Sequence, residues 1–238
     1  MKNKKLWVII PARSGSKGIK NKNIKRLLNI PLFVHSIIFA KKLKFVDKIF
    51  FSSDSIKYCN LAKKHGAYVP FLRSSYASKS NSMEEDVLED IRINLNKNNI
   101  IKPDYILWIR PTTPLRDINA FNRAYKIFLK KTNSICIVNR TESRIFLKRN
   151  KFLRPILKKF KKKSMLRRQE CPEAFKIFYG EFFKFPRKYT KNFLGKKVRY
   201  IEQDTKCDFD IDYKHQFENL EIILKKNRRF YEKFLHTH

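Results

Sequence analysis

The residues best suited to bind a phosphorylated ligand lie in a short segment near the N-terminus. The chain has five glycines, and two of them, Gly15 and Gly18, lie just after an apolar run. Glycine allows a tight turn whose backbone N–H groups approach a ligand closely, and Arg13, Lys17 and Lys22 add positive charge there. Such a loop suits a nucleoside triphosphate. It has neither P-loop nor dinucleotide-loop spacing, so its composition alone fits an ordinary strand-to-helix turn equally well.

A second group of residues with chemical potential is acidic and lies near the C-terminus. The chain has 21 Asp and Glu residues, and seven of them fall in residues 202–221. If residues 208–212 (D-F-D-I-D) form a strand, Asp208, Asp210 and Asp212 share one face because side chains alternate. Like charges repel, and Mg²⁺ prefers carboxylate and phosphate oxygens. A solvated edge is the alternative, but this local reversal in a chain of net charge +34 favours a metal site.

Apolar runs that alternate with amphipathic stretches must position both groups. The alternation predicts βαβ units and a three-layer, doubly wound α/β fold, with a mainly parallel sheet and helices on both faces. Ligands of such sheets bind beyond the carboxyl ends of the strands, so the loops after Ile10, Phe51 and Ile109 should share one crevice. We expect strands at residues 6–10, 48–52, 105–109 and 134–138, an extended segment at 67–72, and helices at 33–43, 56–65, 84–95 and 119–130.

The domain organisation follows from length and periodicity. A chain of 238 residues is long enough for one domain with a substantial core, so residues 1–238 are expected to form a single domain. Residues 140–163 are strongly basic and poorly periodic, which indicates an inserted arm or hairpin. Residues 140–190 are the predicted subregion for dimerisation or sugar binding.

Charge and cysteine content bound the remaining classes. A net charge of +34 is typical of a protein that binds nucleic acid. The basic residues are, however, spread along the chain without a nucleic-acid-binding motif, so compositional bias explains the charge better. The sequence contains no run of 18 or more apolar residues and therefore predicts no membrane span. The N-terminal apolar stretch is too short for a signal peptide. Four scattered cysteines without a C-x-x-C pair suggest reduced thiols, and hence the cytoplasm.

Three segments resemble one known family. Residues 10–24, I-P-A-R-S-G-S-K-G-I-K-N-K-N-I, resemble the acylneuraminate cytidylyltransferase signature R-x-x-S-K-G-[IL]-x-x-K-N. Residues 108–117, W-I-R-P-T-T-P-L-R-D, resemble the same family's L-Q/R-P-T-S/T-P-L-R, and Arg110 in place of glutamine is similar to members that act on bacterial legionaminic-type sugars. Asp210-Ile-Asp212 matches the family's C-terminal D-I-D. The resemblance covers nearly the full length and implies a nucleotide-diphospho-sugar transferase-like fold.

Two shorter matches extend the resemblance. V-P-F-L-R at residues 69–73 resembles the family's V-P-F-x-R-P, whose arginine lies in the nucleotide pocket. Arg168 and Gln169, in L-R-R-Q-E-C-P-E-A-F, resemble the R-Q-x-x-P-x-x-F segment that approaches the sugar. Members of this family are typically homodimers in which an arm reaches the partner's site.

The resemblance implies a reaction and a set of site residues. The reaction is transfer of CMP from CTP to the anomeric hydroxyl of an acidic nine-carbon (nonulosonic, sialic-type) sugar, with Mg²⁺ as cofactor and pyrophosphate as the second product. The implied catalytic residues are Arg13, Lys22 and Asp212; the nucleotide-binding residues are Arg13, Ser16, Lys17, Lys22, Asn23, Arg73 and Arg110; the sugar-binding residues are Arg110, Thr112, Arg168 and Gln169; and the metal ligands are Asp210 and Asp212.

The sugar-side segments depart most from the family pattern. In A-S-K-S-N-S at residues 77–82, Lys79 stands at the usual Asp; T-E-S-R-I occupies 141–145 where H-x-P-x-K is expected; and Tyr179 replaces an Asn. These departures leave open a divergent nucleotide-binding member whose sugar activity is lost or altered. A basic nucleic-acid-binding protein is the less favoured alternative.

Overall fold

The computed structural model describes residues 4–16, 18–130, 133–158 and 165–236. Lys17, one of the predicted nucleotide contacts, therefore lies outside the described residues, as does most of the basic run at 158–163. The strands are β1 (Leu6–Pro11), β2 (Arg26–Leu27), β3 (Ile30–Pro31), β4 (Lys48–Ser52), β5 (Tyr105–Trp108), β6 (Ser134–Thr141), β7 (Phe146–Arg149), β8 (Phe152–Pro155), β9 (Ala174–Lys184) and β10 (Arg199–Glu202). The α-helices are α1 (Leu32–Lys41), α2 (Ile56–Lys64), α3 (Glu84–Lys97), α4 (Ile118–Leu129), α5 (Lys214–Lys226) and α6 (Arg228–Leu235).

A six-stranded sheet with the order β10-β6-β9-β5-β1-β4 forms the centre of the molecule. β1 pairs in parallel with β4 and β5, and β10 pairs in parallel with β6. β9 lies between β5 and β6 and is antiparallel to both, so it runs against the other five strands of this sheet. The mainly parallel α/β class expected from the sequence is confirmed.

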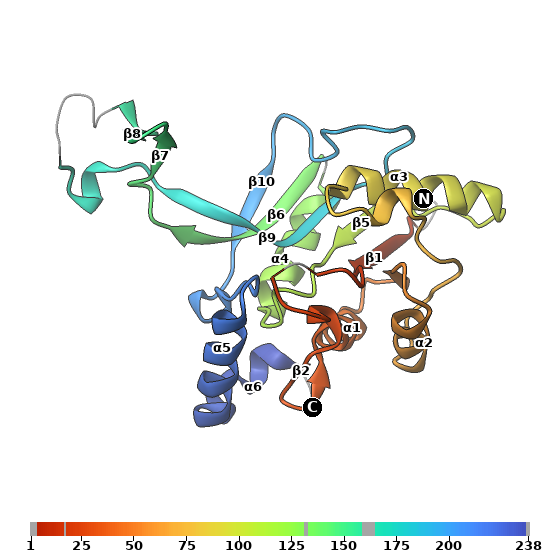
Figure 1. Cartoon of the computed structure of the whole chain (residues 1–238). Coiled ribbons are helices and arrows are strands. Elements are labelled where there is room, and N and C mark those ends of the chain that lie inside the picture. Colours follow the sequence, from red (N-terminus) through yellow and green to blue (C-terminus); the bar gives the residue numbers. More distant parts are fainter. Residues whose placement is uncertain (1–3, 17, 131–132, 159–164, 237–238) are drawn as a thin grey trace.

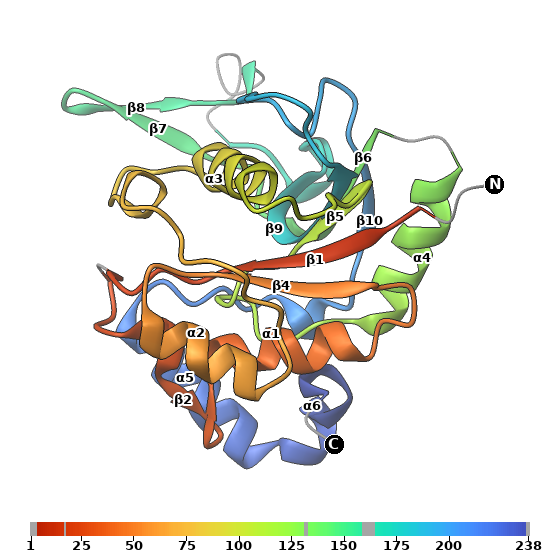
Figure 2. The same ribbon diagram turned by 90° about the vertical axis from the view of Figure 1, so that its right-hand side faces the viewer.

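Alternating side chains of β1 divide the core into two layers. Leu6, Val8 and Ile10 pack with apolar residues of α1, α2 and α4, whereas Trp7 and Ile9 pack with α3 on the opposite face. Figure 2 shows β1 and β4 between α3 on one side and α1 and α2 on the other. Every one of these five β1 side chains is at most 2% exposed, because a strand covered on both faces is apolar throughout.

Local signals end and begin the helices near the expected residues. The Ser55 hydroxyl accepts a hydrogen bond from the Tyr58 N–H at the start of α2, and Gly66 adopts a left-handed φ of 82° just after it. The Asp117 carboxylate accepts from the Asn119 N–H at the start of α4. Three acidic residues in the first turn of α3 interact favourably with the positive end of that helix.

The C-terminal helices form a third apolar cluster beneath the sheet edge. Phe217, Leu220 and Leu224 of α5 and Phe234 of α6 are buried against Leu115, which follows β5. The Arg116 N–H donates to the Phe234 carbonyl at 3.0 Å. The turn after β5 is therefore held by the C-terminal end of the described chain.

One strand differs from the sequence-based expectations. In the segment at 67–72, which was expected only to be extended, Tyr68 makes an isolated parallel bridge with Phe50. β9 was not expected, and it lies within the predicted subregion 140–190 although it belongs to the central sheet. Its register shifts between its pairings with Ile137 and Asn139, and Phe178 in that bulge has a φ of 85°.

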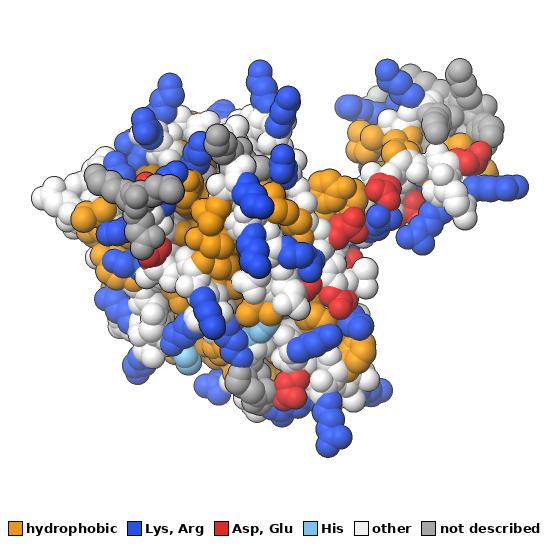
Figure 3. All heavy atoms as spheres, turned by 180° about the vertical axis from the view of Figure 1, so that it is seen from behind, with side chains coloured by type: hydrophobic (Ala, Val, Ile, Leu, Met, Phe, Trp, Pro, Cys, Tyr) orange, Lys and Arg blue, Asp and Glu red, His pale blue; other side chains and the backbone are white. Residues whose placement is uncertain are grey.

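The arm between β6 and β9 carries a two-stranded antiparallel hairpin formed by β7 and β8. It projects from the body of the molecule (Figure 1), and Phe152 and Leu153 are 73% and 70% exposed. Figure 3 shows the arm as a lobe beside the body, with apolar and basic side chains on the same face. Lys and Arg side chains are scattered over the rest of that face as well.

Candidate active site

A cavity of about 960 Å³ opens at the carboxyl ends of β1 and β5. The loops after these two strands line it. The loop after β4, which was expected to share the crevice, does not line it and contacts the loop after β1 through Asp54. The cavity collects most of the residues predicted from the sequence, together with several that were not predicted. Its lining includes Arg13, Ser16, Lys22, Asn23, Arg73, Arg110, Thr112 and Asp212, and also Gly18, Lys79, Glu84, Trp108 and Phe178.

The loop after β1 is braced by side-chain bonds to backbone groups. Asp54 accepts hydrogen bonds from both the Ser14 N–H and the Ser14 hydroxyl, each at 2.8 Å. The buried Asn23 amide donates to the Arg13 carbonyl at 2.9 Å, and Arg13 Nη1 donates to the Lys79 carbonyl at 2.7 Å. Asn23 thus stabilises the loop, while Arg13 spans the cavity wall between two chain segments.

Lys22 connects this loop to the acidic segment near the C-terminus. Its Nζ donates to the Ile211 carbonyl at 2.7 Å and lies 3.1 Å from Asp212 Oδ1. The Ile211 N–H in turn donates to the Thr112 carbonyl in the turn after β5 at 2.9 Å. Three segments far apart in the sequence therefore meet at one edge of the cavity.

Arg73 is a buried cation at the cavity wall. Its side chain donates to the Ser52 hydroxyl at 2.9 Å and to the Ser52 carbonyl at 2.6 Å. Burial lowers the pKa of Arg73 to about 10, although the carboxylates of Asp54 and Asp90 oppose this shift. The guanidinium remains charged at neutral pH and is fixed against the end of β4.

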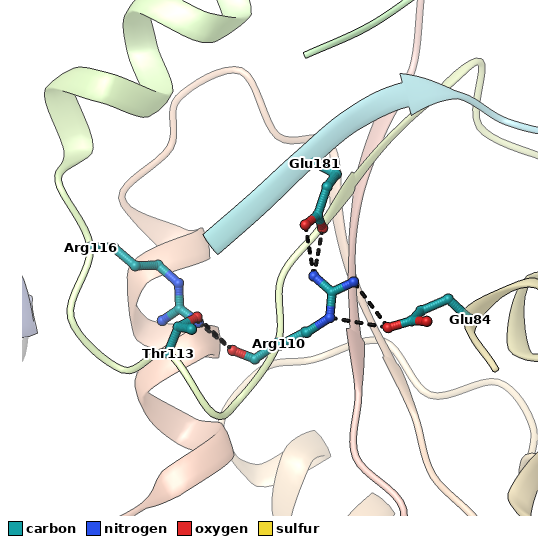
Figure 4. Close-up of polar contacts among 5 residues, drawn as sticks. All are labelled: Glu84, Arg110, Thr113, Arg116 and Glu181. Atoms are coloured by element: carbon teal, nitrogen blue, oxygen red, sulfur yellow. Dashed lines mark hydrogen bonds and ion pairs between the residues drawn. The ribbon is translucent and has the colours of Figure 1, made fainter. Parts of the chain in front are cut away.

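Arg110 has two carboxylate partners. Its Nη1 donates to both oxygens of Glu181 at 2.8 Å, and its Nε and Nη2 donate to one oxygen of Glu84 at 3.1 and 3.0 Å (Figure 4). The Phe178 ring lies 4.7 Å from the guanidinium carbon. Burial alone would lower the pKa of Arg110, but Glu181 and Glu84 together raise it above its ordinary value. Burial raises the pKa of Glu181 although Arg110 opposes this.

Arg116 is a buried arginine for which the sequence analysis predicted no role. Its Nη2 donates to the Arg110 carbonyl at 2.7 Å and to the Ser36 hydroxyl at 3.0 Å, and it lies close to Thr113 (Figure 4). Burial lowers the pKa of Arg116 to about 9. The side chain ties the turn after β5 to α1, so it positions Arg110 and Thr112 without lining the cavity itself.

The expectation that residues 208–212 form a strand is wrong. The segment follows a short 3₁₀ helix, η5 (Thr205–Cys207), and has no strand partner among the described residues. The three aspartates make separate tertiary contacts instead of sharing one face. Asp208 accepts a hydrogen bond from the Tyr179 hydroxyl, Asp212 pairs with Lys22, and Asp210 has a buried Oδ1 without a hydrogen-bond partner among the described residues.

The donor set for the predicted metal is therefore two carboxylates rather than three. Among the described residues no group of three or more His, Cys, Asp or Glu side chains could hold a metal ion. Asp212 lines the cavity, and the buried Asp210 Oδ1 is an oxygen that a cation or water would satisfy. Mg²⁺ is commonly held by one or two carboxylates together with substrate phosphates and water, and the assignment of Asp210 and Asp212 to a metal stays a prediction.

Arg168 and Gln169 do not reach the cavity of their own chain. They lie in the arm, in the short 3₁₀ helix η4 (Arg168–Glu170) that precedes β9. There they line a separate hollow with Thr141, Glu142 and Cys171. Their assignment to sugar binding stays a prediction.

Glu84, Phe178 and Glu181 were missed by the sequence analysis. Glu84 begins α3, and the other two lie in the unexpected strand β9. The signal that could have found Glu181 is a lone acidic residue within an apolar run, Y-G-E-F-F, in a chain with a nearby excess of arginine. The four cysteines are unpaired. Across the described residues no helix is both long and apolar enough to cross a membrane.

Comparison with solved structures defines the class of fold. The structure of CMP:2-keto-3-deoxy-manno-octonic acid synthetase complexed with CTP superposes with a TM-score of 0.66 at 11% identity, covering 94% of this chain and 99% of that one. A structure of 4-diphosphocytidyl-2C-methyl-D-erythritol synthase gives 0.66 at 10% identity, covering 93% and 98%. A model of the family described as cytidylyltransferase matches residues 7–235, so the chain belongs to the cytidylyltransferase family.

Curated relatives share moderate identity with the chain. The post-translational flagellin modification protein B of Campylobacter coli is 25% identical over 226 residues, which cover 91% of this chain and 94% of that protein. The N-acylneuraminate cytidylyltransferase of Escherichia coli O18:K1:H7 is 26% identical over 98% of this chain, which corresponds to 56% of that enzyme. A pseudaminic acid cytidylyltransferase of Campylobacter jejuni is 35% identical over 51% of this chain and 52% of that enzyme.

Proposed function

We propose that this protein transfers CMP from CTP to the anomeric hydroxyl of an acidic nine-carbon sugar, giving a CMP-sugar and pyrophosphate. Membership of the cytidylyltransferase family supports the nucleotide part of this proposal. Its similarity to an N-acylneuraminate cytidylyltransferase and to a pseudaminic acid cytidylyltransferase supports the choice of acceptor. We further propose that the protein acts in the cytoplasm.

One observation carries the proposal. A single cavity is lined by Arg13 and Lys22 from the loop after β1, by Arg73 from the segment after α2, and by Asp212. The cations suit a triphosphate, and the carboxylate lies beside them, where it could share a divalent cation with the phosphates. A volume of about 960 Å³ lies near the top of the range for small-molecule sites, so it leaves room for a nucleotide and a second substrate.

The reaction brings together two anions, the acidic sugar and the triphosphate of CTP. The main task of the protein is therefore to neutralise their charge. The oxygen of the anomeric hydroxyl forms a bond to the α-phosphorus, the bond from that phosphorus to the pyrophosphate oxygen breaks, and the hydroxyl proton leaves to solvent. Negative charge grows on the departing pyrophosphate. Arg13 and Lys22 would stabilise that charge more strongly in the transition state than in the bound substrate.

Asp210 and Asp212 are the residues that would hold the proposed Mg²⁺. When bound there, Mg²⁺ supplies positive charge to the phosphates and lowers the pKa of the attacking hydroxyl. Without a cation, Asp212 is already neutralised by Lys22 at 3.1 Å. Lys22 therefore keeps this carboxylate in position at the cavity edge.

We also propose a homodimer in which the arm of one copy completes the site of the other. Arg168 and Gln169 lie in the arm and line a hollow outside the cavity of their own chain. The β7–β8 hairpin exposes Phe152 and Leu153, and an isolated two-stranded hairpin is marginally stable in water. Sugar contacts by Arg168 and Gln169 thus depend on a second copy, which sedimentation of the full chain would detect.

The proposal is tested by pyrophosphate release. The purified chain is incubated with MgCl₂, with each of the four ribonucleoside triphosphates and with a panel of nonulosonic acids. We expect release with CTP and at least one acid, and none when CTP is replaced by the other three. Absence of release with CTP and every acid would overturn the catalytic proposal and favour a nucleotide-binding protein without sugar activity.

Matched variants separate chemistry from folding. Lys22→Ala removes a cation that lines the cavity, whereas Lys20→Ala removes an exposed cation of the same loop that does not. We expect Lys22→Ala to lower kcat/KM by about 100-fold or more, the scale for one charge-stabilising group, and Lys20→Ala to leave it nearly unchanged. Asp212→Asn should abolish turnover with an unchanged melting temperature; near-normal activity would show that the metal assignment is wrong.

A further inference from the structure

The two carboxylates that bind Arg110 differ in their freedom to leave it. Glu181 lies on the central strand β9, does not line the cavity, and its side chain is 2% exposed. Glu84 is the first residue of α3, lines the cavity, and its side chain is 31% exposed. Only the Glu84 bond therefore faces the space in which a substrate would lie.

Glu84 also binds the guanidinium of Arg110 through only one of its two carboxylate oxygens. One oxygen, Oε1, accepts from both Nε and Nη2 of Arg110 at 3.1 and 3.0 Å. A free carboxylate can place one oxygen opposite each of these N–H groups, which is the stronger, bidentate arrangement. An arriving carboxylate could thus replace Glu84 and improve the bonds to Arg110.

The charges around Arg110 indicate that a substrate carboxylate would replace Glu84 rather than bind beside it. Arg110 carries one positive charge and is bonded to two carboxylates, so this group of three side chains has an excess of negative charge. A third carboxylate would be repelled while Glu84 remains, because like charges at short distance are unfavourable in a partly buried site. Phe178 covers the guanidinium at 4.7 Å and keeps Arg110 in place during such an exchange.

We propose that Glu84 is an internal substitute for the substrate's carboxylate: it occupies the Nε–Nη2 edge of Arg110 and leaves when the carboxylate of the acidic sugar binds there. This inference rests on the function proposed above and deepens it. Glu84 and Arg110 are then specificity-determining residues. A neutral sugar cannot displace Glu84, since it brings no charge to replace the one that Arg110 loses.

The test measures equilibrium binding of N-acetylneuraminate, N,N′-diacetyllegionaminate and their methyl esters by calorimetry. The full chain is saturated with α,β-methylene-CTP, which cannot release pyrophosphate. Glu84→Gln removes the competing charge and nearly preserves the side-chain shape. Glu85→Gln is the matched control, because it removes the same charge from the same turn of α3, whereas the guanidinium bonds of Arg110 go to Glu84 and Glu181.

We expect Glu84→Gln to bind an acid about three- to tenfold more tightly, the worth of one typical hydrogen bond, with no gain for the ester or in Glu85→Gln. An unchanged or weaker affinity, as expected if Glu84 only braces Arg110, overturns the inference. So does a gain confined to the CTP analogue, which would mean that Arg110 receives a phosphate. Absence of acid binding in both forms also overturns it.

Failure of this inference is distinguishable from failure of the proposed function. Pyrophosphate release by the wild-type chain tests the function and does not depend on Glu84 exchange. Suppose that pyrophosphate is released from CTP with an acid, but Glu84→Gln does not change the affinity for that acid. The proposed exchange of Glu84 would then be wrong, whereas the proposed cytidylyl transfer would be supported.

Discussion

The backbone carbonyl oxygen of Asp212 occupies the space that a side chain at position 18 would need. A Cβ built on Gly18 would overlap that oxygen, closer than real Cβ atoms approach any neighbour. Glycine is therefore required at this position by the close approach of the acidic segment, and the approach is the same one that brings Lys22 to Asp212.

Gly18→Ala should separate the loop after β1 from residues 211–212. Because the obstacle is backbone, relief requires a chain shift, and we expect a loss of about 1–3 kcal/mol in unfolding free energy. The kcat/KM for CTP should fall as well. Gly15→Ala is the matched control, since a Cβ there meets nothing within 4 Å. Equal effects of the two variants in urea unfolding and in kinetics would contradict the role assigned to Gly18.

Phe178 should reverse the usual order of alanine and glycine in a strand. Its φ of 85° lies in the left-handed region, which costs a residue with a side chain about 1–2 kcal/mol. Phe178→Ala and Phe178→Gly both lose the ring that covers Arg110. We expect the glycine variant to unfold at higher urea than the alanine variant. The neighbouring Ile177, whose φ is not positive, should show the ordinary order, with alanine the more stable.

Tyr179→Phe tests the anchor of the acidic segment. The hydroxyl of this buried side chain donates to Asp208, and burial and that bond raise the pKa of Tyr179. We expect its removal to lower the unfolding free energy by about 1–2 kcal/mol and to lower the rate of the proposed cytidylyl transfer. A double-mutant cycle with Asp208→Asn should give a coupling energy above about 0.5 kcal/mol. The same change at the exposed Tyr200 of β10 serves as control.

His35 should make the fold sensitive to mild acid. Burial lowers its pKa to about 4, from an ordinary value of 6.5. Between these values the unfolded chain binds a proton that the folded chain does not, so stability is complete above pH 6.5 and falls as the pH drops toward 4. The loss approaches about 3 kcal/mol. Unfolding in urea across this range should show it, and His35→Gln should reduce the slope.

The control for the acid transition is His215→Gln. His215 is exposed on α5, so this variant makes the same substitution at a surface position. Burial lowers the pKa of His65 and of His236 as well, and both residues should contribute to the residual slope of the His35→Gln variant. An identical slope in wild type and His35→Gln would show that His35 does not remain neutral in the folded chain.

Much of the parallel part of the sheet could be predicted because its signals are local. The strand at 48–52 and the helix that follows it appear close to their predicted bounds, since an apolar run, a Ser cap and a Gly stop are written within a few residues. The loop after β1 and the turn after β5 follow from the same logic and open on one cavity, as expected from the carboxyl ends of parallel strands.

The missed features depend on partners that are distant in the sequence. β9 carries Glu181 in its middle, and a buried acid weakens a strand prediction until Arg110, 71 residues away, is known to bind it. The expected strand at 208–212 fails for the same reason, because Tyr179, Thr112 and Lys22 hold its residues individually. The spacing of apolar residues indicates which face of a segment can be buried. It does not indicate which distant side chain will pair with the charged residues of that segment.

The position of β9 in the centre of the sheet affects the order in which the strands can pair during translation. β6 pairs with β9 and β10, and both follow it in the sequence, whereas β4, β1 and β5 can pair among themselves as soon as they are synthesised. During translation β6 has no sheet partner until residues 174–184 leave the ribosome, so its edges stay open to pairing with other chains. Phe178, Asp212 and Tyr213 emerge later than the other residues that line the cavity, and the binding site is therefore completed only after residue 213 has left the ribosome.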